Sequence, residues 1–305
     1  MITLTEVRES FACFGGECTV IVSDAAERDA ARAVEAAKRA LLEWHHRFSR
    51  FESDSELSQL NREPRETVSV SPLMRRVVAA GLRAAHDSGG LVNPTLVDEL
   101  EAAGYVHSLG PGGALPLADA LAAAPPRAPA APDPSARYLE VEVDRATGTV
   151  TRPPGVKLDP GGIAKGVFAD ELATLLAGHG AFVVDCCGDL RVGGADGVLR
   201  DVEVESPFDG TTLHTYSIGT GAFATTGIGR RAWLDPDGRP AHHLLDPASG
   251  RPAFTGVVQA TALAPTAIEA EMRSKAAVLS GPGGAASWLP HGGVVVLDDG
   301  RCLLL

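Results

Sequence analysis

A glycine turn followed by one lysine is the stretch of this sequence best suited to chemistry. Residues 157–170 read KLDPGGIAKGVFAD, where Gly161 and Gly162 precede an apolar helix with Lys165 in its first turn. A helix start leaves backbone N–H groups unpaired and carries partial positive charge. Such a turn favours a phosphate or pyrophosphate, and Lys165 lies within reach of the same anion. We expect Asp159, before the turn, to accept a hydrogen bond from a ligand or to cap the helix.

The same stretch also fits a simpler interpretation, a tight strand-to-helix turn with a solvated lysine. Its spacing matches neither the G-x-G-x-x-G pattern of dinucleotide-binding folds nor the G-K-[ST] ending of a P-loop. The chain has a formal net charge of −12 at pH 7. This charge disfavours nucleic acid and anionic membranes as partners, so a site for an anion must be locally basic.

The elements that must position the turn follow an α+β pattern. Apolar residues at helical spacing predict helices over 25–47, 71–88, 96–103 and 162–177. Strands are expected at 17–23, 199–206, 211–219, 221–227 and 255–264, as a hairpin over 138–153, and as one buried strand within 181–194. A capping box of Thr266 and Glu269 begins a helix over 267–280, and a hairpin turning at Asp299-Gly300 follows it. We therefore predict a large mixed or antiparallel sheet with flanking helices.

Residues 110–136 differ in composition from the rest of the chain. They read GPGGALPLADALAAAPPRAPAAPDPSA, which is rich in proline and alanine. Such a composition is typical of a flexible surface connection. We expect a flexible insertion here and place no chemistry in it.

The cysteines and the N-terminal sequence indicate in which cellular compartment the protein is expected. The chain has five cysteines, an odd number, and they lack zinc-type spacing. This pattern favours reduced thiols. The N-terminal residues lack the pattern of a secretory signal, and no window is apolar enough to span a bilayer. We therefore expect a cytoplasmic protein with no membrane partner.

The sequence resembles the ApbE-type FAD:protein FMN transferases in six stretches that occur in the family's order. They are SRFESDSELSQLN, GLVNPTLVDELEAAGY, LDPGGIAKGVFAD, CGDLRVGG, GAFATTG and HHLLDPASGRP. The resemblance extends over about residues 10–285 and implies a single α+β domain over 1–305, with FAD in a cleft between two lobes. It further implies that FMN is transferred from FAD to a serine or threonine hydroxyl of an acceptor protein. AMP would be the leaving group, and magnesium normally assists.

The resemblance also implies roles for individual residues. Lys165 would hold the pyrophosphate, and His243 would be the general base, a task that suits an imidazole that is neutral near pH 7. Alternatively, His243 is a loop histidine that only forms hydrogen bonds. The carbonyl of Gly162 and the carboxylate of Glu271 would bind the metal. The residues implied at FAD are Phe51, Leu91, Val92, Asn93, Asp159, Gly161, Gly162, Lys165, Thr226, His243, Leu244 and Lys275.

The helix over 267–280 departs from the family pattern. Members usually carry Asp-x-x-x-Thr, and both side chains bind magnesium, whereas here the matching residues are Glu271 and Lys275. A charged ammonium has no lone pair to give a metal and repels a divalent cation. The two residues could form an ordinary i, i+4 helix pair. Alternatively, the ammonium takes the place of the metal against the pyrophosphate and is held by Glu271.

Three smaller departures lie elsewhere. Asn93 stands where an aspartate is usual, Cys187 replaces the first glycine of Gly-Gly-Asp, and Thr226 replaces a serine. Three functions therefore remain open. They are an FMN transferase, a protein that binds FAD without chemistry, and an FAD pyrophosphatase that releases FMN and AMP. All three would use the same phosphate-binding turn.

Overall fold

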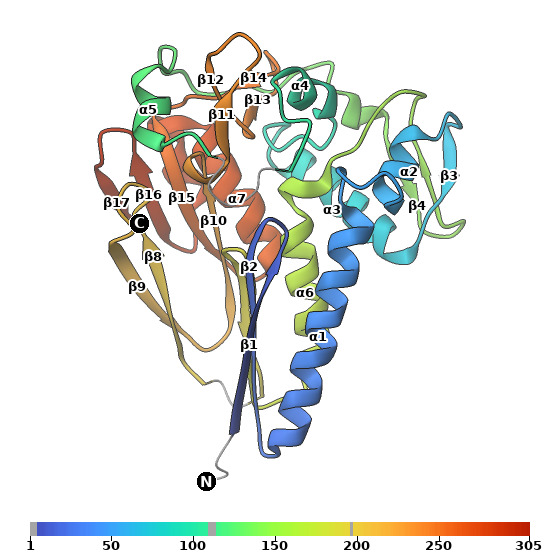
Figure 1. Cartoon of the computed structure of the whole chain (residues 1–305), viewed down its shortest axis with the longest axis vertical. Helices are drawn as coiled ribbons and strands as arrows, with labels where there is room; N and C mark the ends of the chain where they lie inside the picture. Colours follow the sequence, from blue (N-terminus) through green and yellow to red (C-terminus); the bar gives the residue numbers. More distant parts are fainter. Residues whose placement is uncertain (1–4, 109–113, 196–197) are drawn as a thin grey trace.

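One antiparallel sheet organises the chain. The computed structural model describes residues 5–108, 114–195 and 198–305, and its main sheet has eight strands (Figure 1). In sheet order these are β1 (Thr5–Cys13), β2 (Gly16–Asp24), β6 (Ala181–Cys186), β7 (Asp189–Gly193), β10 (Gly221–Gly227), β15 (Val257–Ala264), β16 (Gly293–Leu297) and β17 (Cys302–Leu304). Neighbouring strands all pair antiparallel. The predicted α+β class with an antiparallel sheet is confirmed.

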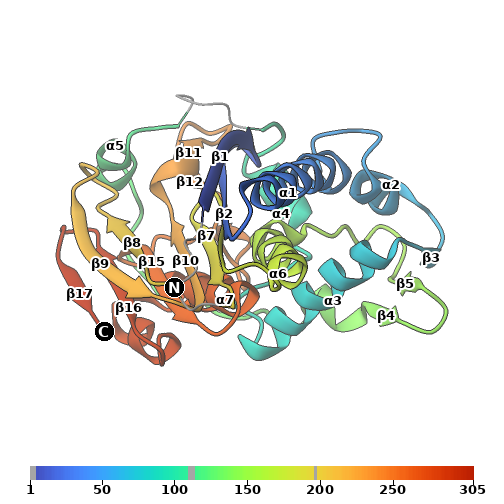
Figure 2. The same ribbon diagram turned by 90° about the horizontal axis from the view of Figure 1, so that it is seen from below.

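Four helices lie on one side of this sheet. They are α1 (Glu27–Phe48), α3 (Pro72–Asp87), α6 (Ala164–Leu176) and α7 (Ala267–Leu279). Helices α1, α6 and α7 pack against its strands, and α3 packs on α6 and α7. Figure 2 shows α1, α6 and α3 side by side, with α7 close to the strands. Phe168 of α6 lies at the centre of the core, where its ring is 5.2 Å from those of Trp44 and Phe48. Helix α7 contributes residues to both of the large core clusters, so it joins the two halves of the sheet.

The alternation of side chains along strand β2 shows which elements lie on each face of the sheet. Cys18, Val20 and Val22 belong to the core under the helices. Alternate residues point the other way, and Ser23 accepts a hydrogen bond from Arg200 at 2.9 Å. Arg200 begins the hairpin of β8 (Arg200–Glu205) and β9 (Thr212–Ile218). That hairpin therefore lies on the face opposite the helices.

Smaller elements surround the sheet. The short helices are α2 (Glu56–Arg62), α4 (Val97–Ala102), α5 (Leu117–Ala122) and α8 (Gly281–Gly284), with 3-10 turns at Arg137–Glu140, Pro160–Gly162, Gly229–Arg231 and Ala285–Trp288. The short strands are β3 (Thr67–Ser69), β4 (Glu142–Asp144), β5 (Thr149–Thr151), β11 (Ala232–Leu234), β12 (Pro240–His242), β13 (Leu245–Asp246) and β14 (Arg251–Pro252). Within the described ranges, no helix combines the length and apolar character needed to cross a membrane.

The run 181–194 is a hairpin rather than the single strand that we expected. Strands β6 and β7 pair antiparallel, with Asp185 opposite Leu190. The turn between them uses positive φ at Cys187 (58°) and Gly188 (94°). Glycine adopts this conformation without strain, but cysteine rarely does. Because a cysteine stands at the first turn position inside an apolar run, the sequence did not indicate a turn there.

The Pro/Ala-rich stretch forms main-chain contacts over its described part, and the flexible insertion that we expected at 110–136 stays a prediction. Residues 109–113 lie outside the described residues, and 117–122 form helix α5. Beyond α5, the backbone N–H groups of Ala128 and Ala130 donate to the carbonyls of Phe254 and Leu279, at 3.1 and 2.8 Å. The N–H of Ala131 donates to the Asp246 carboxylate at 2.8 Å. Main-chain hydrogen bonds thus connect this stretch to the segments around Phe254, Leu279 and Asp246.

Candidate active site

The glycine turn leads into helix α6 as the sequence predicted, and Asp159 caps the 3-10 turn at Pro160–Gly162. The Gly161 N–H donates to Asp159 Oδ1 at 2.8 Å, so the carboxylate satisfies one donor of the turn. A methyl group on Gly162 would lie 3.0 Å from Lys275 Cε. The bare backbone of Gly162 therefore lets the Lys275 side chain cross the turn.

Glu271, which is 1% exposed, joins helix α7 to the start of helix α6. The Gly166 N–H donates to Glu271 Oε2 at 2.9 Å, and Lys165 Nζ lies 3.6 Å from Oε1. Burial raises the pKa of Glu271 to about 7, and the nearby Asp189 carboxylate adds to the rise. One N–H of the helix start is thus already used by the protein's own carboxylate.

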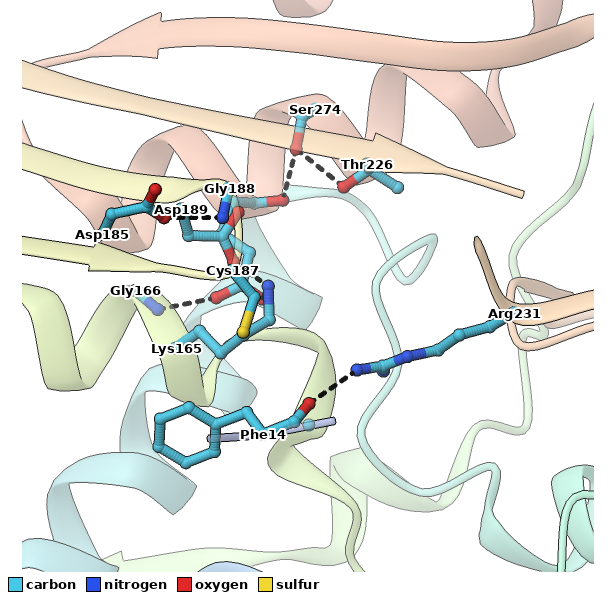
Figure 3. Close-up of polar contacts among 12 residues, drawn as sticks. Phe14, Lys165, Gly166, Asp185, Cys187, Gly188, Asp189, Thr226, Arg231 and Ser274 are labelled. Atoms are coloured by element: carbon cyan, nitrogen blue, oxygen red, sulfur yellow. Dashed lines mark hydrogen bonds and ion pairs between the residues drawn. The ribbon is translucent and has the colours of Figure 1, made fainter. Parts of the chain in front are cut away.

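Lys165 forms an ion pair with Asp189, the first residue of strand β7 (Figure 3). Asp189 is 1% exposed, whereas Lys165 retains some contact with solvent. Burial pulls the pKa of Lys165 down, but the carboxylates of Asp189 and Glu271 outweigh it and leave the pKa above its usual value. Lys165 is therefore a fixed positive charge at neutral pH.

Lys275 does not form the i, i+4 ion pair with Glu271 that one interpretation predicted. Across the described part of the chain, no carboxylate lies within 4.0 Å of its ammonium. Burial lowers the pKa of Lys275, while Glu271 and Asp189 oppose this fall and Lys165 and Arg231 add to it. Lys275 instead lies against Gly162, with its charge directed at the glycine turn.

His243 and Arg231 complete this group of side chains. His243 Nδ1 is buried and has no hydrogen-bond partner among the described residues. Burial lowers the pKa of His243 well below its usual value, and the positive charges of Arg231 and Lys275 lower it further. The imidazole is therefore neutral. Arg231 extends toward the β1–β2 turn, where its Nη2 donates to the Phe14 carbonyl at 3.2 Å (Figure 3).

Phe51 belongs to a second group, which is aromatic and is joined to the turn by Arg50. The Arg50 guanidinium lies over the rings of Phe51 and Tyr105, 4.3 and 4.5 Å from their centroids. Its Nε is 3.2 Å from Asp159 Oδ2. The Tyr105 ring stacks on Trp233 at 4.9 Å. Phe51 is 37% exposed, and Arg50 joins it to the glycine turn through Asp159.

The sequence of this chain matches a known protein family over most of its length. The model of the ApbE family matches residues 14–297. The chain belongs to the ApbE family. Crystal structures of the ApbE protein from Thermotoga maritima and of the Pseudomonas stutzeri flavinyl transferase ApbE share its fold. Their TM-scores are 0.78 and 0.76, at 24% and 21% identity, and they cover 99% and 98% of this chain and 97% and 93% of their own.

The alignments with curated ApbE relatives cover a smaller share of each chain than the structural matches do. The FAD:protein FMN transferase of Rhodobacter capsulatus is 28% identical over 273 residues, which cover 85% of this chain and 48% of the relative. That of Escherichia coli K12 is 28% identical over 149 residues, or 47% of this chain and 42% of the relative. The chain thus spans less than half the length of these two relatives.

The remaining residues implied by the ApbE resemblance lie mostly in packed surroundings. Val92 and Leu244 are buried in the core, and Leu91 packs against it. Asn93 uses its side-chain oxygen to accept from the N–H and hydroxyl of Thr95. In strand β10, the buried Thr226 hydroxyl bonds with Ser274 of α7 at 2.8 Å. Their side chains serve the fold, and their contact with FAD stays a prediction, as does the cleft between two lobes.

The residues of this ApbE chain do not fit the magnesium ion that the resemblance implied. Glu271 is held by Gly166 and lies near Lys165. Lys275 covers Gly162, whose carbonyl was the second expected ligand. Two ammonium groups would repel a hard divalent cation here. Across the described ranges, no cluster of three or more histidine, cysteine, aspartate or glutamate side chains has the arrangement of a metal site.

Three residues of the site were not predicted from the sequence. Arg50 follows the end of α1 and Arg231 lies in the Gly229–Arg231 turn, and long-range folding brings both to the glycine turn. Two consecutive arginines at 230–231 in an acidic chain could have indicated that Arg231 belongs to an anion-binding site. Asp189 lies within the stretch CGDLRVGG, but its pairing with a lysine on α6 was not predicted.

Proposed function

We propose that this protein binds FAD and transfers its FMN part to a serine or threonine hydroxyl of an acceptor protein. The observation that carries the proposal is the neutral His243, whose buried Nδ1 lacks a protein partner beside the cations Lys165, Lys275 and Arg231. Membership of the ApbE family and curated relatives named FAD:protein FMN transferase support the same activity.

The charges of this group suit a pyrophosphate. Three cations surround the turn, and they face the carboxylates of Asp189 and Glu271. Because the pKa of Glu271 is raised to about 7, part of its negative charge is removed at neutral pH. The balance is therefore locally positive in a chain whose net charge is −12. A dianionic pyrophosphate would neutralise this excess.

The proposed reaction breaks one P–O bond and forms another. The acceptor hydroxyl attacks the phosphorus on the FMN side of the pyrophosphate, and His243 takes the hydroxyl proton. The bond to the AMP oxygen breaks, and AMP leaves with that electron pair. Lys165 and Lys275 would stabilise the negative charge that develops on the phosphate oxygens.

We further propose that Lys275 takes the place of the magnesium ion. Its ammonium lies against Gly162, free of an ion pair among the described side chains, which leaves its charge available to a ligand. An ammonium supplies positive charge but no coordination bond, so it replaces the electrostatic part of a Lewis acid's contribution. Glu271 then acts as a helix cap and not as a metal ligand.

Mass spectrometry of a threonine-containing acceptor peptide tests the proposal. The peptide is incubated with protein and FAD, in EDTA and in excess magnesium. A gain equal to one FMN group in both conditions is expected. FMN and AMP without a modified peptide would favour a pyrophosphatase. FAD that stays bound and intact would favour a protein that binds FAD without chemistry.

A further inference from the structure

Four of the five cysteines gather on the helix side of the sheet, next to the Lys165–Asp189 ion pair. Cys13, Cys18 and Cys186 are buried, and all of them are free thiols. Cys18 on β2 lies directly opposite Cys186 on β6 in the strand pairing. Cys187 follows at the turn into β7 and is half-buried. The proposed transfer reaction gives these thiols no role.

Cys187 has the geometry of a thiol ready to pair with Cys18. Its Sγ lies 3.7 Å from Cys18 Sγ and donates to the Cys13 carbonyl at 3.2 Å. Its backbone has φ of 58°, a conformation that is strained for cysteine. Two residues later comes Asp189, the partner of Lys165. Figure 3 shows Cys187, Gly188 and Asp189 together beside Lys165.

We propose that Cys18 and Cys187 form a reversible disulfide, which makes the turn before Asp189 an oxidation site. A disulfide bond is about 2.05 Å long, so the two sulfurs must approach each other. Because the turn at Cys187 carries the chain directly into Asp189, closing the bond displaces the carboxylate that holds Lys165. Oxidation would thus break or weaken the ion pair that holds Lys165 in position.

Cys187 and Cys18 differ in solvent exposure and in the charges around them, and these differences give them different roles in the oxidation. The hydrogen bond from Cys18 lowers the pKa of Cys187, and the positive charge of Lys165 acts in the same direction. Hydrogen bonds with neighbouring thiols raise the pKa of Cys18, which is fully buried. Thiolates are the reactive form. Cys187 therefore reacts first with an oxidant from solution, and Cys18 resolves the intermediate.

The oxidant is a low-molecular-weight disulfide. The Cys187 thiolate attacks one of its sulfurs, forms a mixed disulfide and releases one small thiol. Cys18 then loses its proton and attacks the Cys187 sulfur, which releases the second small thiol. Two protein thiols are oxidised, and one external disulfide is reduced to two thiols.

The test treats the whole protein with oxidised glutathione and maps linked peptides by mass spectrometry without reduction. We expect a Cys18–Cys187 cross-link that disappears after dithiothreitol. It should be absent from Cys18→Ser and Cys187→Ser and retained in the matched control Cys302→Ser, because Cys302 is an exposed thiol on β17. A different cysteine pair, or glutathione that stays on Cys187 without a cross-link, would overturn the inference.

A second measurement examines the consequence for the site, and it rests on the proposed function. Oxidation should weaken FAD binding by about tenfold, and dithiothreitol should restore it, while oxidised Cys18→Ser keeps its affinity. A cross-linked protein with unchanged affinity would contradict the coupling to Lys165. If the reduced protein binds no FAD, the proposed function fails, and the disulfide is then judged on the cross-link alone.

Discussion

Asp170 and Glu271 each cap the helix on which the other lies. Asp170 of α6 accepts hydrogen bonds from the Ala267 and Ile268 N–H groups at the start of α7, both at 3.0 Å. Glu271 of α7 accepts from the Gly166 N–H at the start of α6, at 2.9 Å. This exchange fixes the two helix starts beside each other. It therefore also fixes the two lysines that these helices bring to the glycine turn.

Replacing Gly166 by alanine should disrupt this helix pair. A methyl group there would lie 2.7 Å from the Ala267 carbonyl oxygen, and backbone cannot move aside as a side chain can. We expect Gly166→Ala to lower the free energy of unfolding by about 1 to 3 kcal/mol. The matched control Gly178→Ala has open space around its added methyl group. In urea unfolding it should stay within about 0.5 kcal/mol of the wild type, and equal stability of both variants would refute the close contact.

The buried Glu271 carboxyl should make stability depend on pH. Burial raises its folded pKa from 4.5 to about 7, so between these values the folded state binds a proton that the unfolded state has lost. The cost of burying the charge is absent below this window and complete above it. The stability of Glu271→Gln relative to the wild type should therefore rise by about 1 to 3 kcal/mol from about pH 5 to about pH 7.5. Urea unfolding at both pH values checks this, with Glu35→Gln, at an exposed position of α1, as the surface control. An unchanged difference would contradict the raised pKa.

Removing the Lys165 ammonium should weaken FAD binding. Lys165→Ala is expected to reduce the binding free energy by about 1 to 3 kcal/mol, the scale of a hydrogen bond to a charged group. It also leaves the buried Asp189 without its partner, so the free energy of unfolding should fall as well. A flavin fluorescence titration measures the dissociation constant. Lys38→Ala, which removes a surface lysine paired with Glu9, is the control. An unchanged dissociation constant for Lys165→Ala would exclude this lysine from the site.

Replacing Lys275 by threonine should make the protein respond to magnesium. The change removes the ammonium and supplies a hydroxyl oxygen, a ligand that magnesium accepts. We expect Lys275→Thr to lose transfer activity in EDTA and to regain part of it in excess magnesium. Lys157→Thr, which alters a surface lysine paired with Asp98 and Glu101, should leave the wild-type response unchanged. The idea that the ammonium replaces the metal fails if Lys275→Thr is equally active in EDTA and in magnesium.

Removing the imidazole of His243 should affect the reaction more than binding. We expect His243→Gln to lower kcat by about 10²- to 10⁴-fold, the usual loss on removing a general base, with little change in FAD affinity. His291→Gln, at an exposed position, serves as the control. The kcat comes from the rate of FMN incorporation into the acceptor peptide at saturating FAD. A normal kcat would mean that His243 is a loop histidine that only forms hydrogen bonds.

Local signals made most helices predictable from the sequence. The side chain of Ser71 caps α3, and the Thr266 hydroxyl accepts from the Glu269 N–H at the start of α7, as the capping box predicted. The β6–β7 hairpin was missed because its turn falls at Cys187, inside an apolar run. The order of strands in the sheet was not predicted either, since it joins segments that lie far apart along the chain.

The site was predictable where one motif carries it. Lys165 follows the glycine turn closely in the sequence, and Lys275 and Glu271 share one helix, so their proximity follows from local geometry. The partners Asp189 and Arg231 come from other elements, and only the folded chain brings them to the turn. Periodicity and spacing contain no information on such contacts.

The stretch of residues 125–131 shows how a segment can change in sequence and keep its main-chain contacts. Its bonds to Phe254, Leu279 and Asp246 start from backbone N–H groups, which every residue except proline provides. The exposed Ala128 can therefore be exchanged for other small residues, whereas Ala130 packs against the core. Arg127 is also an exception, because its guanidinium pairs with Asp298 and replacing it would remove a side-chain contact of this stretch.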